Sequence, residues 1–171
     1  MNWHKRHLAI VLLAWLPIAA FGQELGDREA EVLSVAEAAL EAITAGDWTD
    51  LADLMIDEAT TVMSRERDGE FQHRVSTRAD TAATPAGSDI VERGFGPEVR
   101  VAGTLGMVWL PYDLYVDGEW SHCGVDTFTL IETAAGWRIV SLAYSIEQPP
   151  ACRPHPDGPP VLVSLEDGIC Q

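Results

Sequence analysis

Basic residues are scarce in this sequence of 171 residues, which contains a single lysine, Lys5. Lysine and arginine together number 11 against 27 aspartates and glutamates, so the formal net charge is −16 at pH 7. Such an acidic surface repels phosphate backbones and anionic membrane surfaces. We therefore expect neither nucleic acid nor a membrane surface as a partner. The charge itself is explained by solubility or by the composition of the source genome, and it points to no activity.

Apolar runs long enough to cross a membrane are missing as well. The run over residues 8–21 has about 15 residues, whereas a membrane-spanning helix needs about 20. Lys5 and Arg6 precede this run and Ala20-Phe21-Gly22 ends it, which is the pattern of a secretory signal peptide. We expect cleavage after Gly22 and an exported protein, periplasmic or secreted, with no membrane attachment after cleavage. Loss of Lys5 and Arg6 changes the formal net charge from −16 to −18.

Cysteine is rare, with three residues, Cys123, Cys152 and Cys170. In an exported chain these residues raise the question of a disulfide. A Cys152–Cys170 bridge would close a loop of 17 intervening residues and would stabilise the fold by about 3 kcal/mol in the chain-entropy model. We expect this bridge, with Cys123 as a free buried thiol that packs like a small hydrophobic residue. A Cys123–Cys152 bridge is the competing pairing.

The spacing of apolar residues predicts helices first and strands after them. A helix is predicted over residues 28–45, ended by Gly46, and a shorter one is capped by Asp47. Residues 59–75 are typical of a hairpin that turns at Asp68-Gly69, and Thr77 to Asp80 would cap one short helix. Four more strands are predicted over residues 99–102, 105–116, 119–132 and 137–146.

This order of elements predicts an α+β domain over residues 23–147, with N-terminal helices packed on a curved antiparallel sheet. Residues 148–171 contain six prolines and cannot continue the sheet. We expect them to form an irregular tail, closed by the disulfide.

The stretch EWSHCGVD, residues 119–126, places a histidine, a cysteine and an aspartate on one predicted strand. Side chains alternate between the two faces of a strand, so His122 and Cys123 point in opposite directions, whereas His122 and Asp126 share a face. A catalytic pair or joint metal site formed by His122 and Cys123 is therefore not expected. No other histidine has a spacing that completes a metal site, and we expect no metal and no other cofactor.

A two-residue turn at Asp117-Gly118 would set the pairing of this strand with the preceding one. The turn puts Asp113 opposite His122 and Trp109 opposite Asp126. We therefore expect a carboxylate–imidazole pair between Asp113 and His122. Asp126 would lie beside Trp109.

Both faces of the predicted sheet carry many apolar residues, so both must be covered. The helices would cover the face whose residues floor a pocket: Trp109, His122, Asp126, Phe128 and Trp137. The opposite face would carry Leu110, Tyr112, Val125, Leu142 and Tyr144. Because apolar surfaces of that size are uncommon in monomers, we expect a homodimer through the opposite face.

Two segments carry a resemblance to a known superfamily: AITAGDWTDLADLMIDEAT (residues 42–60) and VWLPYDLYVDGEWSHCGVDTFTLIETAAGWRIVSLAYS (residues 108–145). Their order of helix, Gly-Asp, short helix, hairpin and meander resembles the nuclear transport factor 2-like (NTF2-like) superfamily, also called SnoaL-like. The second segment is similar to its bacterial lumazine-binding-like branch. The resemblance covers residues 28–147 and implies a cone-shaped domain. It implies no single activity, because this fold hosts isomerases, cyclases, dehydratases, hydrolases and binding modules.

The resemblance also allows one reaction to be tested. In the ketosteroid-isomerase branch, a strand aspartate ahead of the last hairpin stabilises an oxyanion, and Asp126 occupies the similar place. That branch also needs a tyrosine on the first helix and a base on the first strand. The similar positions here are near Ala39 and Met63, and neither side chain transfers a proton. The resemblance thus argues against isomerisation by that mechanism.

Two functional classes stay open at this point. In the first, the domain binds a small, partly apolar molecule in its cone, with ligand contacts from Trp109, Asp113, Phe128 and Trp137. In the second, it is a cofactor-independent lyase, isomerase or cyclase with His122 and Asp126 as acid and base. The alternative to both is that the polar residues hydrogen-bond to each other inside an apolar cone and have no functional role. A solvent-connected cavity that reaches His122 is the observation that separates these hypotheses.

Overall fold

Three helices and seven strands make up the part of the chain that the computed structural model describes, residues 26–161. The helices are α1 (Asp27–Ala45), α2 (Trp48–Asp53) and α3 (Arg78–Ala82). The strands are β1 (Met55–Arg67), β2 (Glu70–Thr77), β3 (Ile90–Gly94), β4 (Glu98–Ala102), β5 (Leu105–Val116), β6 (Glu119–Thr133) and β7 (Gly136–Ile146). The signal peptide predicted over residues 1–22 lies outside the described residues. No helix within residues 26–161 is long and apolar enough to span a membrane.

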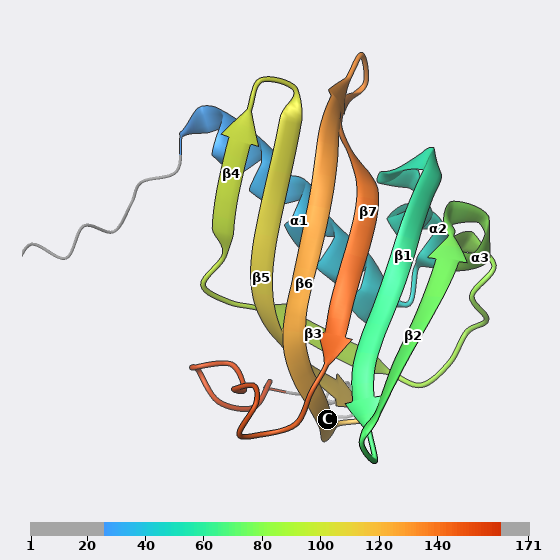
Figure 1. Ribbon diagram of the computed structural model, residues 1–171, viewed down its shortest axis with the longest axis vertical. Helices are drawn as coiled ribbons and strands as arrows, with labels where there is room; N and C mark the ends of the chain where they lie inside the picture. The colour runs from blue at the N-terminus through green and yellow to red at the C-terminus, as the bar shows by residue number, and fades with distance from the viewer. Residues whose placement is uncertain (1–25, 162–171) are drawn as a thin grey trace, which may run out of the picture.

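The strands form one open, curved sheet in the order β2-β1-β7-β6-β5-β3, and β4 also pairs with β5 (Figure 1). All pairs are antiparallel except β1 with β7. Helix α1 crosses the back of this sheet in Figure 1, and α3 packs on β1 and β2. The predicted α+β class, with helices on one face of a curved antiparallel sheet, is confirmed.

The predicted ends of the helices are also confirmed. Gly46 ends α1 with a left-handed backbone, φ 67°, which glycine adopts without the steric cost of a Cβ atom. Asp47 accepts a hydrogen bond from the backbone N–H of Asp50 at 2.9 Å and so caps α2. Thr77 and Asp80 form a capping box at α3. These local signals place α2 and α3 beside the same end of the sheet.

The inner face of the sheet packs on α1 through an apolar core. Its members share near-complete burial and include Val32, Ala36, Ala39, Leu40, Val108, Leu110, Phe128, Leu130, Ile139 and Leu142. Apolar burial is the main term that stabilises such a domain. The core fills the end of the cone near α1, which leaves the other end of the inner face free for polar groups.

A one-residue bulge at Ser121 changes the predicted pairing of β5 with β6. Tyr115 pairs with Trp120 as the turn requires, but the next pair is Leu114 with His122, and Asp113 lies opposite Cys123. The expected pairs Asp113–His122 and Trp109–Asp126 are therefore wrong. Because side chains alternate along a strand, a shift of one residue moves every β5 side chain to the other face relative to His122.

A second bulge, at Val140, has the same effect on the pairing of β6 with β7. Phe128 lies opposite Leu142 and Asp126 lies opposite Tyr144, each one residue away from the predicted partner. The even-numbered residues of β5, such as Tyr112, thus share the inner face with Asp126, Leu142 and Tyr144.

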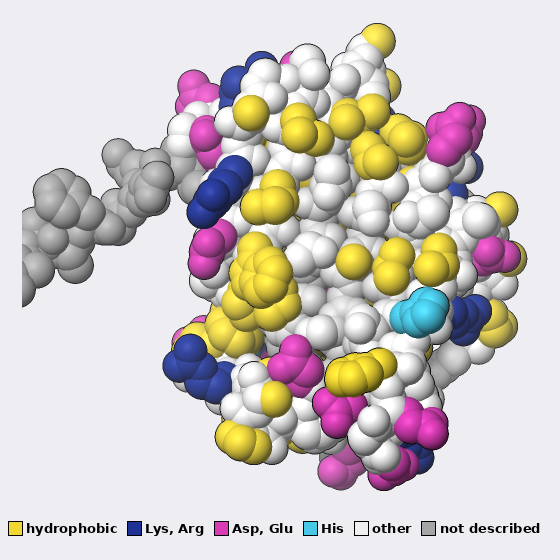
Figure 2. Space-filling model, in the orientation of Figure 1, with side chains coloured by type: hydrophobic (Ala, Val, Ile, Leu, Met, Phe, Trp, Pro, Cys, Tyr) yellow, Lys and Arg dark blue, Asp and Glu magenta, His cyan; other side chains and the backbone are white. Residues whose placement is uncertain are grey.

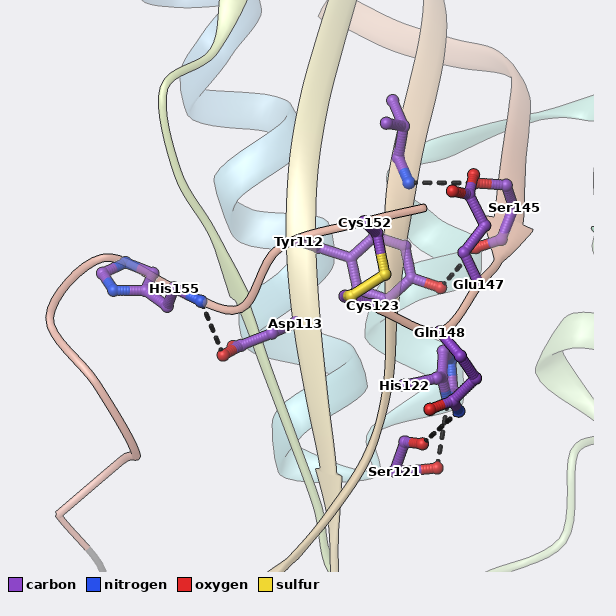
Figure 3. The surroundings of a disulfide bond; sticks show 11 residues. Tyr112, Asp113, Ser121, His122, Cys123, Ser145, Glu147, Gln148, Cys152 and His155 are labelled. Carbon is purple, nitrogen blue, oxygen red and sulfur yellow. Dashed lines mark hydrogen bonds between the residues drawn. A yellow bond between two sulfur atoms is a disulfide. The ribbon is translucent and has the colours of Figure 1, made fainter. Parts of the chain in front are cut away.

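The chain that follows β7 covers one end of the outer face. Glu147 and Cys123 exchange backbone hydrogen bonds, with N···O distances of 2.8 and 3.3 Å. Cys152 then forms a disulfide with Cys123, and the Cα atoms of the two residues lie 5.8 Å apart (Figure 3). The expected Cys152–Cys170 bridge and free Cys123 thiol are therefore wrong, and the competing pairing is the one present. Cys170 lies outside the described residues.

The same segment satisfies a buried carboxylate beside the disulfide. The backbone N–H of His155 donates to Asp113 Oδ2 at 2.9 Å, and Arg93 donates to both Asp113 oxygens at 3.0 and 2.7 Å. Cys123, Asp113 and Arg93 are neighbours in one row across β6, β5 and β3. The tail is thus attached at two adjacent points of the outer face.

Apolar side chains on the rest of the outer face gather over β4 and β5 (Figure 2). Leu105, Met107 and Trp109 are 50%, 40% and 45% exposed. Four of the five residues predicted for a dimer surface do not lie on the outer surface. Leu110, Tyr112 and Leu142 are buried, and Tyr144 lines an inner cavity. Val125 is the remaining residue of the predicted set. The homodimer itself stays a prediction.

Candidate functional site

A cavity of about 410 Å³ lies between the inner face of the sheet and helices α2 and α3. Most of its wall is apolar or aromatic: Ile43, Trp48, Leu51, Met63, Ile90, Tyr112, Leu114, Val116, Leu142, Tyr144 and Ile146. Its polar residues are Thr61, Arg74, Ser76, Asp80, Thr81, Thr84, Glu92, His122 and Asp126. Since Arg74, Asp80 and Thr84 are exposed, the cavity opens to solvent at their side. A solvent-connected cavity therefore reaches His122, and it has the size and composition of a small-molecule site.

Two rows of paired residues place the polar groups of this cavity. In the first row, Glu92 of β3 pairs with Leu114 of β5, which pairs with His122 of β6. In the second row, Asp126 of β6 pairs with Tyr144 of β7. The bulges at Ser121 and Val140 create both rows, because without them different residues would face inward.

Asp126 is the most deeply buried acid of the cavity. It is 3% exposed, and its Oδ2 has no hydrogen-bond partner among the described residues. Burial, and secondarily the nearby charge of Glu92, hold the pKa of Asp126 well above its usual range. The raised pKa favours the protonated form of the carboxyl, in which it presents an O–H donor to the cavity.

Glu92 is a second acid whose proton is retained near neutrality. Burial raises the pKa of Glu92 to about 8. The residue is half-buried, and it lines both this cavity and a second one between α1 and β3. Its backbone is fixed by Thr44, whose Oγ1 accepts from the Glu92 N–H at 3.0 Å.

His122 lies in the wall next to Tyr112. Its Nδ1 is 2.9 Å from Ser121 Oγ, and its ring meets the Tyr112 ring edge-on with centroids 5.8 Å apart (Figure 3). Burial lowers the pKa of His122, so the imidazole is neutral at neutral pH. A neutral imidazole can accept a proton.

Tyr112 separates His122 from Asp126. It pairs with Gly124, midway between them on β6, and its hydroxyl donates to the Ser145 carbonyl at 2.7 Å. Gly124 permits this approach, because a Cβ atom there would collide with that carbonyl. Four strand residues span about 13 Å, so His122 and Asp126 lie at different parts of the cavity wall.

The structure places two of the six predicted site residues in the cavity wall, His122 and Asp126. The other four residues, predicted as ligand contacts, do not line this cavity. Trp109 is exposed on the outer face, Asp113 is bonded to Arg93 there, and Phe128 and Trp137 belong to the core. Among residues 26–161, no group of three His, Cys, Asp or Glu residues is arranged to hold a metal ion.

Three further residues of the site, Glu92, Tyr144 and Arg74, are not predicted from the sequence. Glu92 lies on a strand that the pattern does not reveal, and the bulge at Val140 turns Tyr144 inward. Arg74 follows from the hairpin register, in which it pairs with Met63. The resemblance compares Met63 with the catalytic base of the ketosteroid-isomerase branch. The hairpin register together with this comparison is therefore the sequence signal that could have indicated Arg74.

The raised pKa of Glu92 makes the stability of the fold depend on pH. Between pH 4.5, the ordinary pKa of the side chain, and about 8, the folded state keeps a proton that the unfolded chain has lost. Unfolding then releases a proton, so this contribution is full below pH 4.5 and is lost as the pH rises through about 8. We expect Glu92→Gln to raise the free energy of unfolding at pH 8 by roughly 1–2 kcal/mol, a value discounted for partial exposure.

Thermal unfolding of both proteins from pH 4.5 to 8 measures this effect. The two curves should converge at low pH and separate as the pH rises. Glu98→Gln removes the same charge from an exposed site on β4 and should leave the curve parallel to that of the wild type. Parallel curves for Glu92→Gln would contradict the assignment.

Comparison with known proteins establishes the fold of this chain. No protein-family model matches the sequence, and no curated protein matches it. An NTF2-like protein with a cystatin-like fold from Novosphingobium aromaticivorans superposes with a TM-score of 0.57 at 18% identity, over 70% of this chain and 81% of that chain. An NTF2-like protein from Pseudomonas putida gives 0.57 at 14% identity, over 77% and 96%.

A ketosteroid isomerase-like protein from Erwinia carotovora atroseptica gives a TM-score of 0.52 at 16% identity, over 73% of this chain and all of that one. These likenesses show that the chain has the NTF2-like, cystatin-like fold, which the resemblance implies. At such identities they show the fold alone. The lumazine-binding-like branch stays a prediction.

Proposed function

We propose that this protein binds a small, partly apolar molecule in the cavity between α2, α3 and the sheet. The observation that carries the proposal is the Asp126 carboxyl, which is buried in the cavity wall with Oδ2 unpartnered among the described residues. A buried polar group without a partner costs about 1–3 kcal/mol. A ligand that accepts a hydrogen bond from Asp126 removes that cost.

A second group in the same wall supports this proposal. The indole Nε1 of Trp48 is also buried and has no partner among residues 26–161. Asp126 and Trp48 come from opposite sides of the cavity, the sheet and α2. Two unsatisfied donors on facing walls fit a ligand with polar groups on an apolar body better than they fit a cone plugged by side chains.

A ligand screen by thermal shift, followed by titration calorimetry, tests the proposal on the mature protein. We expect Asp126→Leu, which keeps the volume and removes the donor, to weaken binding about tenfold. Asp89→Asn removes the carboxylate of an exposed loop residue and should leave the affinity unchanged. Equal affinity of the wild type and Asp126→Leu for every ligand found would contradict the proposal.

The second candidate function is acid–base catalysis by a cofactor-independent lyase, isomerase or cyclase. The observation that favours it is the opposite shift of two pKa values, raised for Asp126 and lowered for His122, which favours the uncharged forms of an acid and a base in one cavity. Asp126→Asn keeps a hydrogen-bond donor but transfers no proton. For an enzyme it should reduce turnover by about a hundredfold or more with binding retained, whereas a binding protein shows no turnover to lose.

Export and assembly belong to the same proposal. The Cys123–Cys152 disulfide fits an oxidising compartment, periplasmic or extracellular. A homodimer would now use the apolar surface of Leu105, Met107 and Trp109 on the outer face. The lumazine-binding-like branch is proposed from the residue string over 108–145 that carries the resemblance.

A further inference from the structure

Arg74 is the sole basic side chain in the wall of the cavity apart from the neutral His122. It lies on β2 at the rim, is exposed, and makes no ion pair with any described residue. In a chain with 27 acidic residues and 11 basic ones, this arginine places a positive charge at the mouth of the cavity. Its fork of N–H donors matches a carboxylate.

One acid in the cavity wall is close enough for the charge of Arg74 to help lower its pKa, but it forms no ion pair with Arg74. Asp80 lies on the same rim, but its Oδ2 accepts from the backbone N–H and the Oγ1 of Thr77 at 2.9 and 2.8 Å. Asp80 is thereby committed to capping α3. By contrast, Arg78 on that helix bonds to the Ala52 carbonyl and to Asp53 at 2.8 and 3.0 Å.

The sheet fixes the span between Arg74 and Asp126. One continuous row of paired residues runs from Asp126 through Tyr144 and Met63 to Arg74. This row crosses three strand spacings, which is about 14 Å between the outer backbones. Met63 and Tyr144 supply an apolar and aromatic floor between the two polar ends.

We propose that the ligand of this cavity is an amphipathic monocarboxylic acid. Arg74 binds its carboxylate at the rim, the apolar body lies over Met63 and Tyr144, and a carbonyl or hydroxyl oxygen at the far end accepts a hydrogen bond from Asp126. This inference rests on the proposed binding function and names its ligand class. The deep end disfavours a second negative charge on the ligand, because burial there already disfavours the charged forms of Asp126 and Glu92.

Three matched probes test the inference by titration calorimetry on the mature protein. They are an oxodecanoate with its ketone near the far end of the chain, the methyl ester of that acid, and decanoate. We expect the keto acid to bind about tenfold more tightly than its ester, because the ester lacks the charge that Arg74 recognises. Decanoate should bind more weakly than the keto acid, since it offers Asp126 no acceptor.

Arg74→Gln and Arg100→Gln separate a local contact from the effect of net charge. Arg100 is exposed on β4, at the other side of the sheet, and its loss changes the net charge by the same amount. We expect Arg74→Gln to bring the keto acid to the affinity of its ester, and Arg100→Gln to preserve the difference. Added salt should weaken binding of the acid and not of the ester.

Each remaining outcome contradicts a specific claim. If the ester binds as tightly as the acid, or if Arg74→Gln leaves the affinity for the acid unchanged, the ligand class is wrong while the binding function stands. If none of the three probes binds the wild type while the thermal-shift screen finds another ligand, the ligand class is wrong, and if the screen also finds none, the proposed binding function is contradicted together with this inference.

Discussion

Removal of the Cys123–Cys152 disulfide is expected to lower the free energy of unfolding by about 3–4 kcal/mol. The bridge joins residues 29 positions apart, and the chain-entropy model gives that range for a loop of this length. The double variant Cys123→Ala/Cys152→Ala leaves neither partner of the bridge as a free thiol, and denaturant unfolding of the full mature chain measures the loss. Such a change is a large fraction of the stability of a typical domain.

Cys170→Ser is the matched control, because it distinguishes the two pairings. If Cys123 and Cys152 are joined, this variant should unfold at the same denaturant concentration as the wild type, and non-reduced peptides should contain Cys123 linked to Cys152. If the Cys170→Ser variant loses as much stability as the double variant, the Cys152–Cys170 pairing would be the correct one instead.

The signals that predict this fold from its sequence are local ones. Gly46, Asp47 and the Thr77–Asp80 box act on their own helix ends, and the Asp117-Gly118 turn fixes the first two pairs of its hairpin. Such features depend on residues that are close in the sequence. The helices, the hairpin and four later strands are therefore predicted nearly at their observed bounds.

The bulges are not visible in the sequence, and they decide the site. Ser121 and Val140 each fit an ordinary strand position, and nothing local marks them as unpaired. One extra residue on β6 moves Asp113 to the outer face and Tyr112 to the inner one. His122 and Asp126 are predicted together because both lie on the bulged strand beyond the bulge, where alternation holds whatever the register.

The missed strand and the missed disulfide pairing have a non-local cause as well. The five residues of β3 alternate too briefly to give a period, and their place is set by pairing with β5. The Cys123–Cys152 bridge follows from the path of the tail, which Glu147 starts by pairing with Cys123. Both depend on contacts between segments that are distant in the sequence.

Asp113→Asn is expected to lower the free energy of unfolding by about 3 kcal/mol, because removal of one partner leaves the other charge of a buried pair uncompensated. The Asp113 side chain is 0% exposed and accepts three hydrogen bonds, two from Arg93 and one from the His155 N–H. An asparagine must direct its amide NH₂ toward one of these donors. Glu119→Gln, at an exposed position of β6, should have little effect.

The loss should also appear at the tail, which a general loss of stability would not single out. Asp113 Oδ2 holds the His155 amide at 2.9 Å, so hydrogen exchange at His155 should accelerate in Asp113→Asn more than exchange in α1. In the double variant Asp113→Leu/Arg93→Leu no unpaired charge remains, and it should lose less stability than the two single variants together. Additive losses, with unchanged exchange at His155, would mean that the carboxylate neither pairs with Arg93 nor anchors the tail.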